Sequence, residues 1–118
     1  MMTTHDDKTL LELAAKAAGY EFWDYNGSYR VRTRPNREEY PEWEPWNPLT
    51  DDGDALRLAV KLRMEVNIEM FSTNATVHEP YSEEHEQHGD DPYAATRRAI
   101  VRAAAQLALT SVEIGKTL

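Results

Sequence analysis

The sequence predicts an α+β domain in which three helices pack with one four-stranded, mainly antiparallel sheet. Two observations lead to this class. Apolar residues recur with a helical period in three segments. Between these helices lie two pairs of short strand-like segments, and residues 28–34 and 64–71 among them alternate with a period of two. The order is helix, hairpin, helix, hairpin, helix, without βαβ crossover units. At 118 residues the chain has the length of one domain, residues 1–118.

The first predicted helix follows a polar tail, residues 1–5. Asp6 or Asp7 can cap its first turn, and Gly19 stands where a glycine ends a helix. Its buried face is predicted to hold Leu10, Leu13, Ala14 and Ala17.

A hairpin is predicted next, with Asn26-Gly27 as its two-residue type I′ turn between residues 20–25 and 28–34. The returning strand alternates. Tyr29, Val31 and Thr33 share one side, whereas Arg30, Arg32 and Arg34 share the other. We expect these arginines to lie opposite Glu65 and Glu69 of the second hairpin.

Residues 35–48 are predicted to form a loop, because four prolines in this segment break helices and strands. The loop also holds large aromatic residues: Tyr40, Trp43 and Trp46. Such residues either pin a loop to the body of the domain or form a recognition surface, and the sequence leaves both open. We expect Trp46 to fix the junction with the next helix.

The second helix is predicted to start near residues 52–54, with Asp52 or Asp54 as its cap. Its buried stripe comprises Ala55, Leu58, Ala59 and Leu62, widened by Leu56 and Val60. Residues 64–71 then alternate, which places Met64, Val66, Ile68 and Met70 inward. Residues 72–74 are expected to turn, and residues 75–79 to return as the fourth strand.

Residues 80–91 are predicted to form a solvated acidic loop that contains His85 and His88. Asp91 can cap the last helix, and Pro92 suits its first position. We expect this helix to end near Thr110 and to be followed by a short tail. Its core side is predicted to hold Tyr93, Thr96, Ile100, Ala103, Ala104 and Leu107.

Two segments resemble a known family. They are WNPLTDDGDAL at residues 46–56 and DDPYAATRRAI at residues 90–100. Both are similar to small phage and prophage proteins grouped as the phage ABA sandwich domain, and the first helix, residues 10–19, is similar to the same family. The resemblance implies an α/β/α layered fold and a phage or prophage origin. It implies no catalytic residue.

The charge distribution restricts the partners. The net charge is -8, and residues 38–91 carry three basic and fifteen acidic side chains. This segment should repel phosphate backbones, so no direct nucleic-acid binding is expected. An acidic surface can instead attract a basic protein, including one that itself binds nucleic acid.

The chain has no cysteine, so it has neither disulfides nor thiolate metal sites. Its start lacks a secretory pattern, and no apolar run approaches the ~20 residues that span a bilayer. We therefore expect a cytoplasmic protein, located in the bacterial host, with no membrane partner.

Patterns typical of catalysis or of metal binding are absent. His78, His85 and His88 lie among glutamates, but their spacing matches no metal motif. The aspartates at 51, 52 and 54 do not form a calcium loop, and no nucleophile elbow or glycine-rich phosphate loop is present. We expect a non-enzymatic protein with no cofactor and no metal.

These observations predict a phage accessory protein that inhibits a host protein, such as a CRISPR or other anti-phage defence component, through an acidic and aromatic surface. The residues predicted to bind the partner are Glu38, Glu39, Tyr40, Glu42, Trp43 and Glu44. An alternative is a sponge for a small nucleotide-like ligand, with the predicted ligand residues Arg30, Arg32, Arg34, Trp43 and Trp46. A structural or regulatory phage protein is a further alternative. The sequence predicts no oligomeric state.

Overall fold

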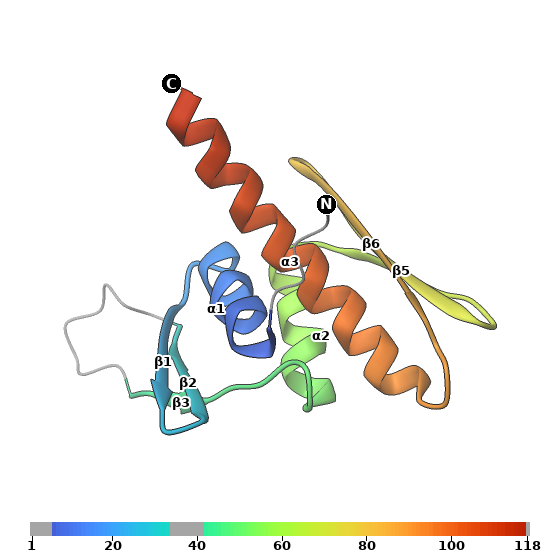
Figure 1. Ribbon diagram of the computed structural model, residues 1–118, viewed down its shortest axis with the longest axis horizontal. Coiled ribbons are helices and arrows are strands. Elements are labelled where there is room, and N and C mark those ends of the chain that lie inside the picture. Colours follow the sequence, from blue (N-terminus) through green and yellow to red (C-terminus); the bar gives the residue numbers. More distant parts are fainter. Residues whose placement is uncertain (1–5, 34–41, 118) are drawn as a thin grey trace.

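The computed structural model describes residues 6–33 and 42–117, with side chains described to residue 110. This part of the chain forms three helices and two three-stranded antiparallel sheets (Figure 1). The elements are α1 (Asp7–Ala17), β1 (Glu21–Tyr25), β2 (Ser28–Arg32), β3 (Glu44–Pro45), α2 (Asp52–Lys61), β4 (Glu65–Ile68), β5 (Ser72–His78), β6 (Tyr81–Gln87) and α3 (Pro92–Thr117). The predicted α+β class is confirmed.

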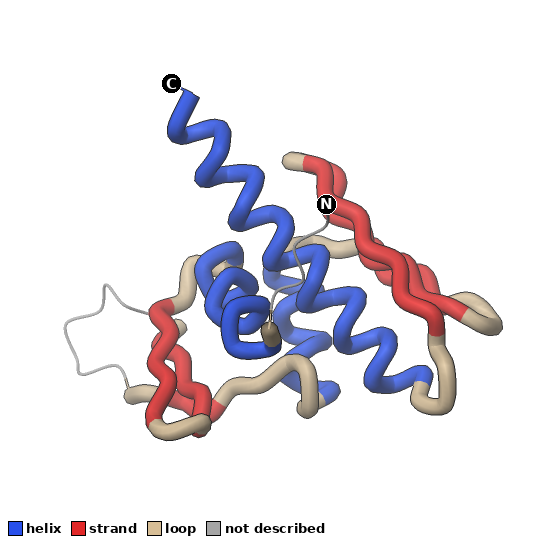
Figure 2. The backbone as a smooth tube through the Cα atoms, in the orientation of Figure 1, coloured by secondary structure: helices blue, strands red, loops and turns tan. Residues whose placement is uncertain are grey.

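The strands form two separate sheets, so the predicted single four-stranded sheet is wrong. One sheet has the order β1-β2-β3 and the other has the order β4-β5-β6. The helices lie between them (Figure 2), and they therefore form the central layer in place of the α/β/α order. On one side α1 packs on β1, and on the other α3 packs on β5 and β6. Each predicted hairpin gains a third strand from a segment that looked like a loop.

The third strand of the first sheet comes from the proline-rich segment. Val31 of β2 pairs with Glu44, and the Trp46 N–H donates to the carbonyl oxygen of Tyr29 (3.0 Å). Pro45 is tolerated because β3 is an edge strand, where a missing N–H need not cost a ladder bond. The predicted loop 35–48 is thus wrong at residues 44–45, and its residues 35–41 lie outside the described part, as do residues 1–5.

The third strand of the second sheet is β6, in the segment predicted to be a solvated loop. Ser82, which is buried, donates to the carbonyl oxygen of Ala103 in α3 (2.8 Å). Arg102 of α3 pairs with Glu84 (3.0 Å) and Glu86 (2.6 Å). The sequence of β6 shows no alternation of apolar residues, because the side chains that face α3 are the polar groups of Ser82, Glu84 and Glu86. Apolar periodicity therefore cannot detect it.

The second hairpin turns earlier than predicted. β5 begins at Ser72, and the Glu69 N–H donates to the Ser72 carbonyl oxygen (2.8 Å), which places the turn at residues 69–71. Ile68 and Met70 were predicted to point into the core, yet both are exposed. The separation of the sheets also removes the expected pairing of the β2 arginines with Glu65 and Glu69.

Aspartate side chains cap the starts of the three helices, and two of these caps are the predicted ones. Asp6 accepts the Thr9 N–H (2.8 Å) and Asp91 accepts the Ala94 N–H (3.1 Å), which confirms both caps. The cap of α2 is Asp51, which accepts the Asp54 N–H (2.8 Å), and not Asp52 or Asp54. Helix α3 continues to Thr117, so the predicted end near Thr110 is wrong.

Two backbone signals are confirmed by their positive φ angles. Gly19 follows α1 with a φ of 79°, and Asn26 and Gly27 have φ angles of 52° and 84°. These are the left-handed values that a helix-ending glycine and a type I′ turn require.

The core lies where the helices meet each other and the inner faces of the sheets. It contains the predicted residues Leu10, Ala14, Ala55, Leu58, Ala59, Ile100, Ala103 and Ala104, and Leu107 is buried as well. Leu56, Val60 and Tyr93 were predicted to be buried but are exposed. For Leu56 and Val60 the reason is that the buried surface of α2 is only the narrow stripe Ala55, Leu58 and Ala59.

Candidate functional site

The first sheet has two unlike faces. Neighbouring residues in register share a face, and Phe22 lies opposite Val31 on the inner face, which packs on the helices. Trp23 lies opposite Arg30, so both project from the outer face. Glu21 and Arg32, and Tyr25 and Ser28, share that outer face through the same register.

Aromatic rings and an arginine gather on this outer face. The Trp23 ring centroid lies 5.2 Å from that of Tyr25 and 5.4 Å from that of Trp43. The guanidinium carbon of Arg32 lies 4.4 Å from the centroid of the Trp43 ring, within the range of a cation–π contact. Below, "the aromatic face" means Trp23, Tyr25, Arg30, Arg32 and Trp43.

The aromatic face is open to solvent. Trp23 is 42% exposed and Tyr25 is 55% exposed, whereas Trp43 and Arg30 are half-buried. Leaving apolar ring surface in water costs about 25 cal/mol per Å², so adjoining exposed rings favour a surface that another molecule covers.

Arg32 is held in place from two sides. Its Nε donates to a Glu21 carboxylate oxygen (2.9 Å), a second guanidinium nitrogen contacts the same oxygen, and the guanidinium carbon lies over the Trp43 ring. A guanidinium fixed in this way needs little further ordering to bind an incoming group.

The residues predicted from the sequence fall in different places. Arg30, Arg32 and Trp43 come together on the aromatic face. Glu42, next to Trp43 in the chain, is exposed, whereas Glu44 lies opposite Val31 in register and lines a groove on the inner side. Glu38, Glu39, Tyr40 and Arg34 lie outside the described residues.

Trp46 is part of the core rather than of the aromatic face. It is 6% exposed and packs edge-on against Tyr20 (6.1 Å between centroids) and Phe22 (6.5 Å). The predicted structural role of Trp46 at the junction is confirmed. Its burial does not favour the alternative role of stacking on a ligand.

Sequence reasoning missed Trp23 and Tyr25, although a signal for them was present. A two-residue turn at Asn26-Gly27 sets the register, which places Trp23 opposite Arg30. The side of the hairpin that carries the arginines therefore also carries both aromatic residues.

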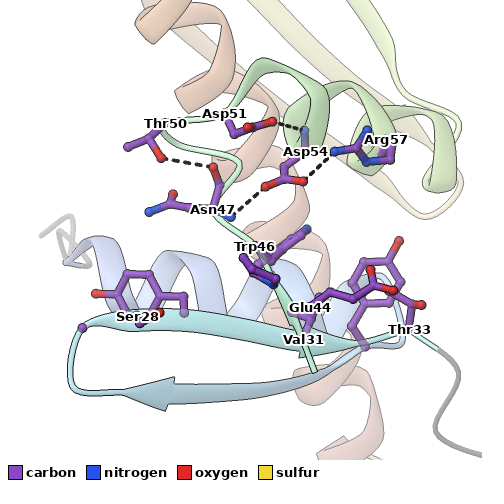
Figure 3. A pocket seen from close by; sticks show the side chains of 14 residues that line it. Ser28, Val31, Thr33, Glu44, Trp46, Asn47, Thr50, Asp51, Asp54 and Arg57 are labelled. Carbon is purple, nitrogen blue, oxygen red and sulfur yellow. Dashed lines mark hydrogen bonds and ion pairs between the residues drawn. The ribbon is translucent and has the colours of Figure 1, made fainter. Parts of the chain in front are cut away.

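A groove of about 840 Å³ lies between β2–β3 and the start of α2 (Figure 3). Its α2 wall carries Asp54, which accepts hydrogen bonds from the Asn47 N–H (3.0 Å) and from the Arg57 guanidinium (2.7 Å), while Asp51 caps the helix. These contacts give both carboxylates a structural role. Tyr20 also lines the groove, and burial raises the pKa of its hydroxyl.

The three histidines considered for metal binding have separate partners. His78 contacts Glu65 (2.8 Å), His85 contacts Asn74, and His88 contacts Thr73 (2.8 Å). Within residues 6–33 and 42–117, no group of three or more histidine, aspartate or glutamate side chains is arranged to hold a metal ion. No helix in the same ranges is long and apolar enough to cross a membrane.

Among the described residues the aromatic face is therefore the candidate binding surface. The comparisons with known proteins add no information about it. A scan of family models and a search of curated proteins found no match to this chain.

Proposed function

We propose that this protein is a non-catalytic binding protein that docks on another protein through the aromatic face. The observation that carries the proposal is the contact between Trp23, Tyr25 and Trp43 on an exposed sheet surface. Tryptophan, tyrosine and arginine are the residues most enriched at the energetic centres of protein interfaces. The aromatic face combines all three.

The net charge of the chain, -8, suits a basic partner, and the exposed rings suit one that also has an apolar surface. On the face itself Arg32 is paired with Glu21, and Glu42, next to Trp43 in the chain, is exposed. The overall field of an acidic protein steers a basic partner toward it. Proteins that bind nucleic acid present such basic surfaces.

The biological setting of the proposal rests on the resemblance to phage proteins at residues 46–56 and 90–100. In that setting the protein acts in the cytoplasm of a bacterial host and inhibits a host component, such as a CRISPR or other anti-phage defence protein. Such a component commonly has a basic nucleic-acid surface, which the acidic and aromatic surface would cover.

The test is affinity purification from a host lysate, followed by titration calorimetry with the recovered partner. Trp23→Ala together with Trp43→Ala should weaken binding by about 30-fold or more, since an interface centre of this kind contributes about 2 kcal/mol or more. Tyr93→Ala is the matched control, because Tyr93 is an exposed aromatic residue on α3. Unchanged affinity of the double variant would refute docking through the aromatic face.

A second candidate is binding of a small nucleotide-like ligand, favoured by the position of two arginines beside the indoles of Trp23 and Trp43. Arg30 and Arg32 can meet phosphate while Trp23 or Trp43 stacks on a base. Tryptophan fluorescence should then change on titration with mononucleotides and cyclic dinucleotides, and Arg30→Ala should weaken the response. A flat titration with the whole panel would exclude this candidate.

A further inference from the structure

β4 is one edge strand of the second sheet, and among the described residues its outward backbone groups have no strand partner. The sheet order is β4-β5-β6, so within residues 6–33 and 42–117 β4 has a neighbouring strand on one side only. The Glu69 N–H donates to the Ser72 carbonyl oxygen, and alternate residues of an antiparallel strand bond to the same neighbour. The backbone groups of Glu65 and Asn67 therefore face β5, whereas those of Val66 and Ile68 point away from the sheet.

Exposed apolar side chains accompany this free edge. Ile68 is 62% exposed, and Met70 and Phe71 in the following turn are 82% and 73% exposed. A strand edge with unpaired backbone and exposed apolar side chains pairs readily with another strand. Natural edges normally prevent this with charges, prolines or bulges.

We propose that two copies of this chain pair through β4, antiparallel and about a two-fold axis at Val66, to form one continuous sheet. Val66 then exchanges two backbone hydrogen bonds with the partner's Val66. The Ile68 N–H donates to the Met64 carbonyl oxygen of the other copy. The aromatic face lies on the other sheet, so this inference is independent of the proposed docking function.

Side-chain charge selects this register. An axis at Val66 places Met64 opposite the partner's Ile68 and Glu65 opposite the partner's Asn67, so apolar groups meet apolar groups and no carboxylates face each other. It also brings Arg63 to the same end of the interface as the partner's Glu69.

The neighbouring registers place like charges together. An axis at Asn67 sets Glu65 opposite the partner's Glu69 twice, and an axis at Glu65 sets the two copies of that residue opposite each other. An axis between two residues would pair the apolar side of one strand with the polar side of the other. Among the axes at Glu65, Val66 and Asn67 and those between residues, the axis at Val66 is the one that avoids these conflicts.

The opposite edge of the sheet is protected by charge. β6 carries Glu83, Glu84 and Glu86 within seven residues, so pairing of two β6 strands would bring carboxylates together. The two edges thus differ, and β4 is the one that accepts a second copy.

The first test is the mass of the purified protein in solution, by analytical ultracentrifugation over a concentration series. The wild type should sediment as a dimer of the 13.6 kDa chain. Ile68→Lys should be monomeric, while Tyr81→Lys, a matched change on β6 at a side chain of similar exposure (60%), should stay dimeric. A monomeric wild type at every concentration would overturn the proposal, as would loss of the dimer in Tyr81→Lys with its retention in Ile68→Lys.

The second test measures the register through disulfide formation, since the chain has no native cysteine. Glu65→Cys and Asn67→Cys should not cross-link alone. Mixed together they should form a disulfide-linked heterodimer, because the two positions face each other with Cα atoms about 4.5 Å apart. Cross-linking of Asn67→Cys with itself, or no cross-linking in the mixture, would overturn the register. Circular dichroism of each variant verifies that the fold is retained.

Discussion

At the scale of single residues, Trp43 and Trp46 lie three positions apart in an extended segment and have different roles. Side chains alternate along a strand, so an odd number of steps places two residues on opposite faces. Trp43 reaches the outer face, where it contacts Trp23 and Arg32. Trp46 reaches the inner face, where it packs against Tyr20 and Phe22. One stabilises the fold, and the other is available to a partner.

The first prediction separates these two tryptophans by stability. Trp46→Ala should lower the free energy of unfolding by about 3–5 kcal/mol, because it removes a fully packed ring from the core. Trp43→Ala should cost less than about 2 kcal/mol, since its ring is half-buried at the surface. Urea denaturation followed by far-ultraviolet circular dichroism measures both. Equal losses would show that the two rings have similar environments.

The second prediction concerns the pH dependence of stability at Tyr20. Burial raises the pKa of Tyr20 above its ordinary value of 10.0; Arg57 opposes this, while Glu44 and Asp54 add to it. The unfolded state therefore ionises first. The stability from the neutral hydroxyl is complete below pH 10.0 and is lost as the pH rises through the higher folded pKa.

Tyr20→Phe should consequently lose less stability than the wild type when urea denaturation is repeated above that pH. The other tyrosines are common to both proteins and cancel in the comparison. Parallel pH profiles of the two proteins would contradict a raised pKa at this position.

At the scale of elements, β6 owes its position to polar contacts with α3. Arg102 joins the helix to the strand through two carboxylates, Glu84 and Glu86, all three of which are half-buried. Ser82 adds a buried hydrogen bond to the helix backbone, and Thr73 of β5 bonds to Thr96 of α3 (2.8 Å). A strand with few apolar side chains is thereby held on a helix.

The third prediction tests this attachment with two arginines of α3. Arg102→Ala should lower the free energy of unfolding by about 1–3 kcal/mol, because it leaves two half-buried carboxylates without their partner. Arg98→Ala is the control: Arg98 pairs with Asp7 (3.0 Å), whose side chain is exposed, and such a pair contributes at most about 1 kcal/mol. Thermal and urea unfolding of both variants measure the difference. A larger loss in Arg98→Ala would contradict the proposed role of Arg102.

At the scale of the whole molecule, the two sheets share one helical layer (Figure 1). Helix α3 packs on α1, on α2 and on β5 and β6, while α1 packs on β1. Arg97 of α3 also donates to the carbonyl oxygen of Leu49 (2.7 Å) and pairs with Asp52 (2.6 Å), which joins α3 to the segment that leads from β3 into α2. Neither sheet is covered without these shared helices, so the described part should unfold as one unit.

The fourth prediction uses the position of the tryptophans to test this cooperativity. All three lie in or beside the first sheet: Trp23, Trp43 and Trp46. Val77 is buried in the second sheet, and Val77→Ala leaves a cavity there. If the sheets unfold together, this variant should lower the unfolding midpoint by the same amount whether tryptophan fluorescence or circular dichroism measures it. Val60→Ala, an exposed site on α2, should change neither. A fluorescence midpoint that does not respond to Val77→Ala would show that the sheets unfold independently.

Local features of the chain were predictable from the sequence because their causes act over a few residues. The caps at Asp6 and Asp91, the left-handed Gly19 and the Asn26-Gly27 turn all depend on backbone groups no more than four positions away. The buried stripes of α1 and α3 follow from helical periodicity in the same way. Of the aromatic face, Arg30, Arg32 and Trp43 were predicted as site residues, whereas Trp23 and Tyr25 were not.

The sequence by itself therefore determined the three helices, the first hairpin and the α+β class. The tertiary structure alone decided that the strands divide into two sheets, that Glu44–Pro45 and Tyr81–Gln87 become strands, and that Trp23 joins Trp43 in one surface. The physical reason is the range of the contacts. Helix ends and turns depend on neighbouring residues, whereas β6 depends on Arg102 and Ser82, and β3 depends on the carbonyl oxygen of Tyr29.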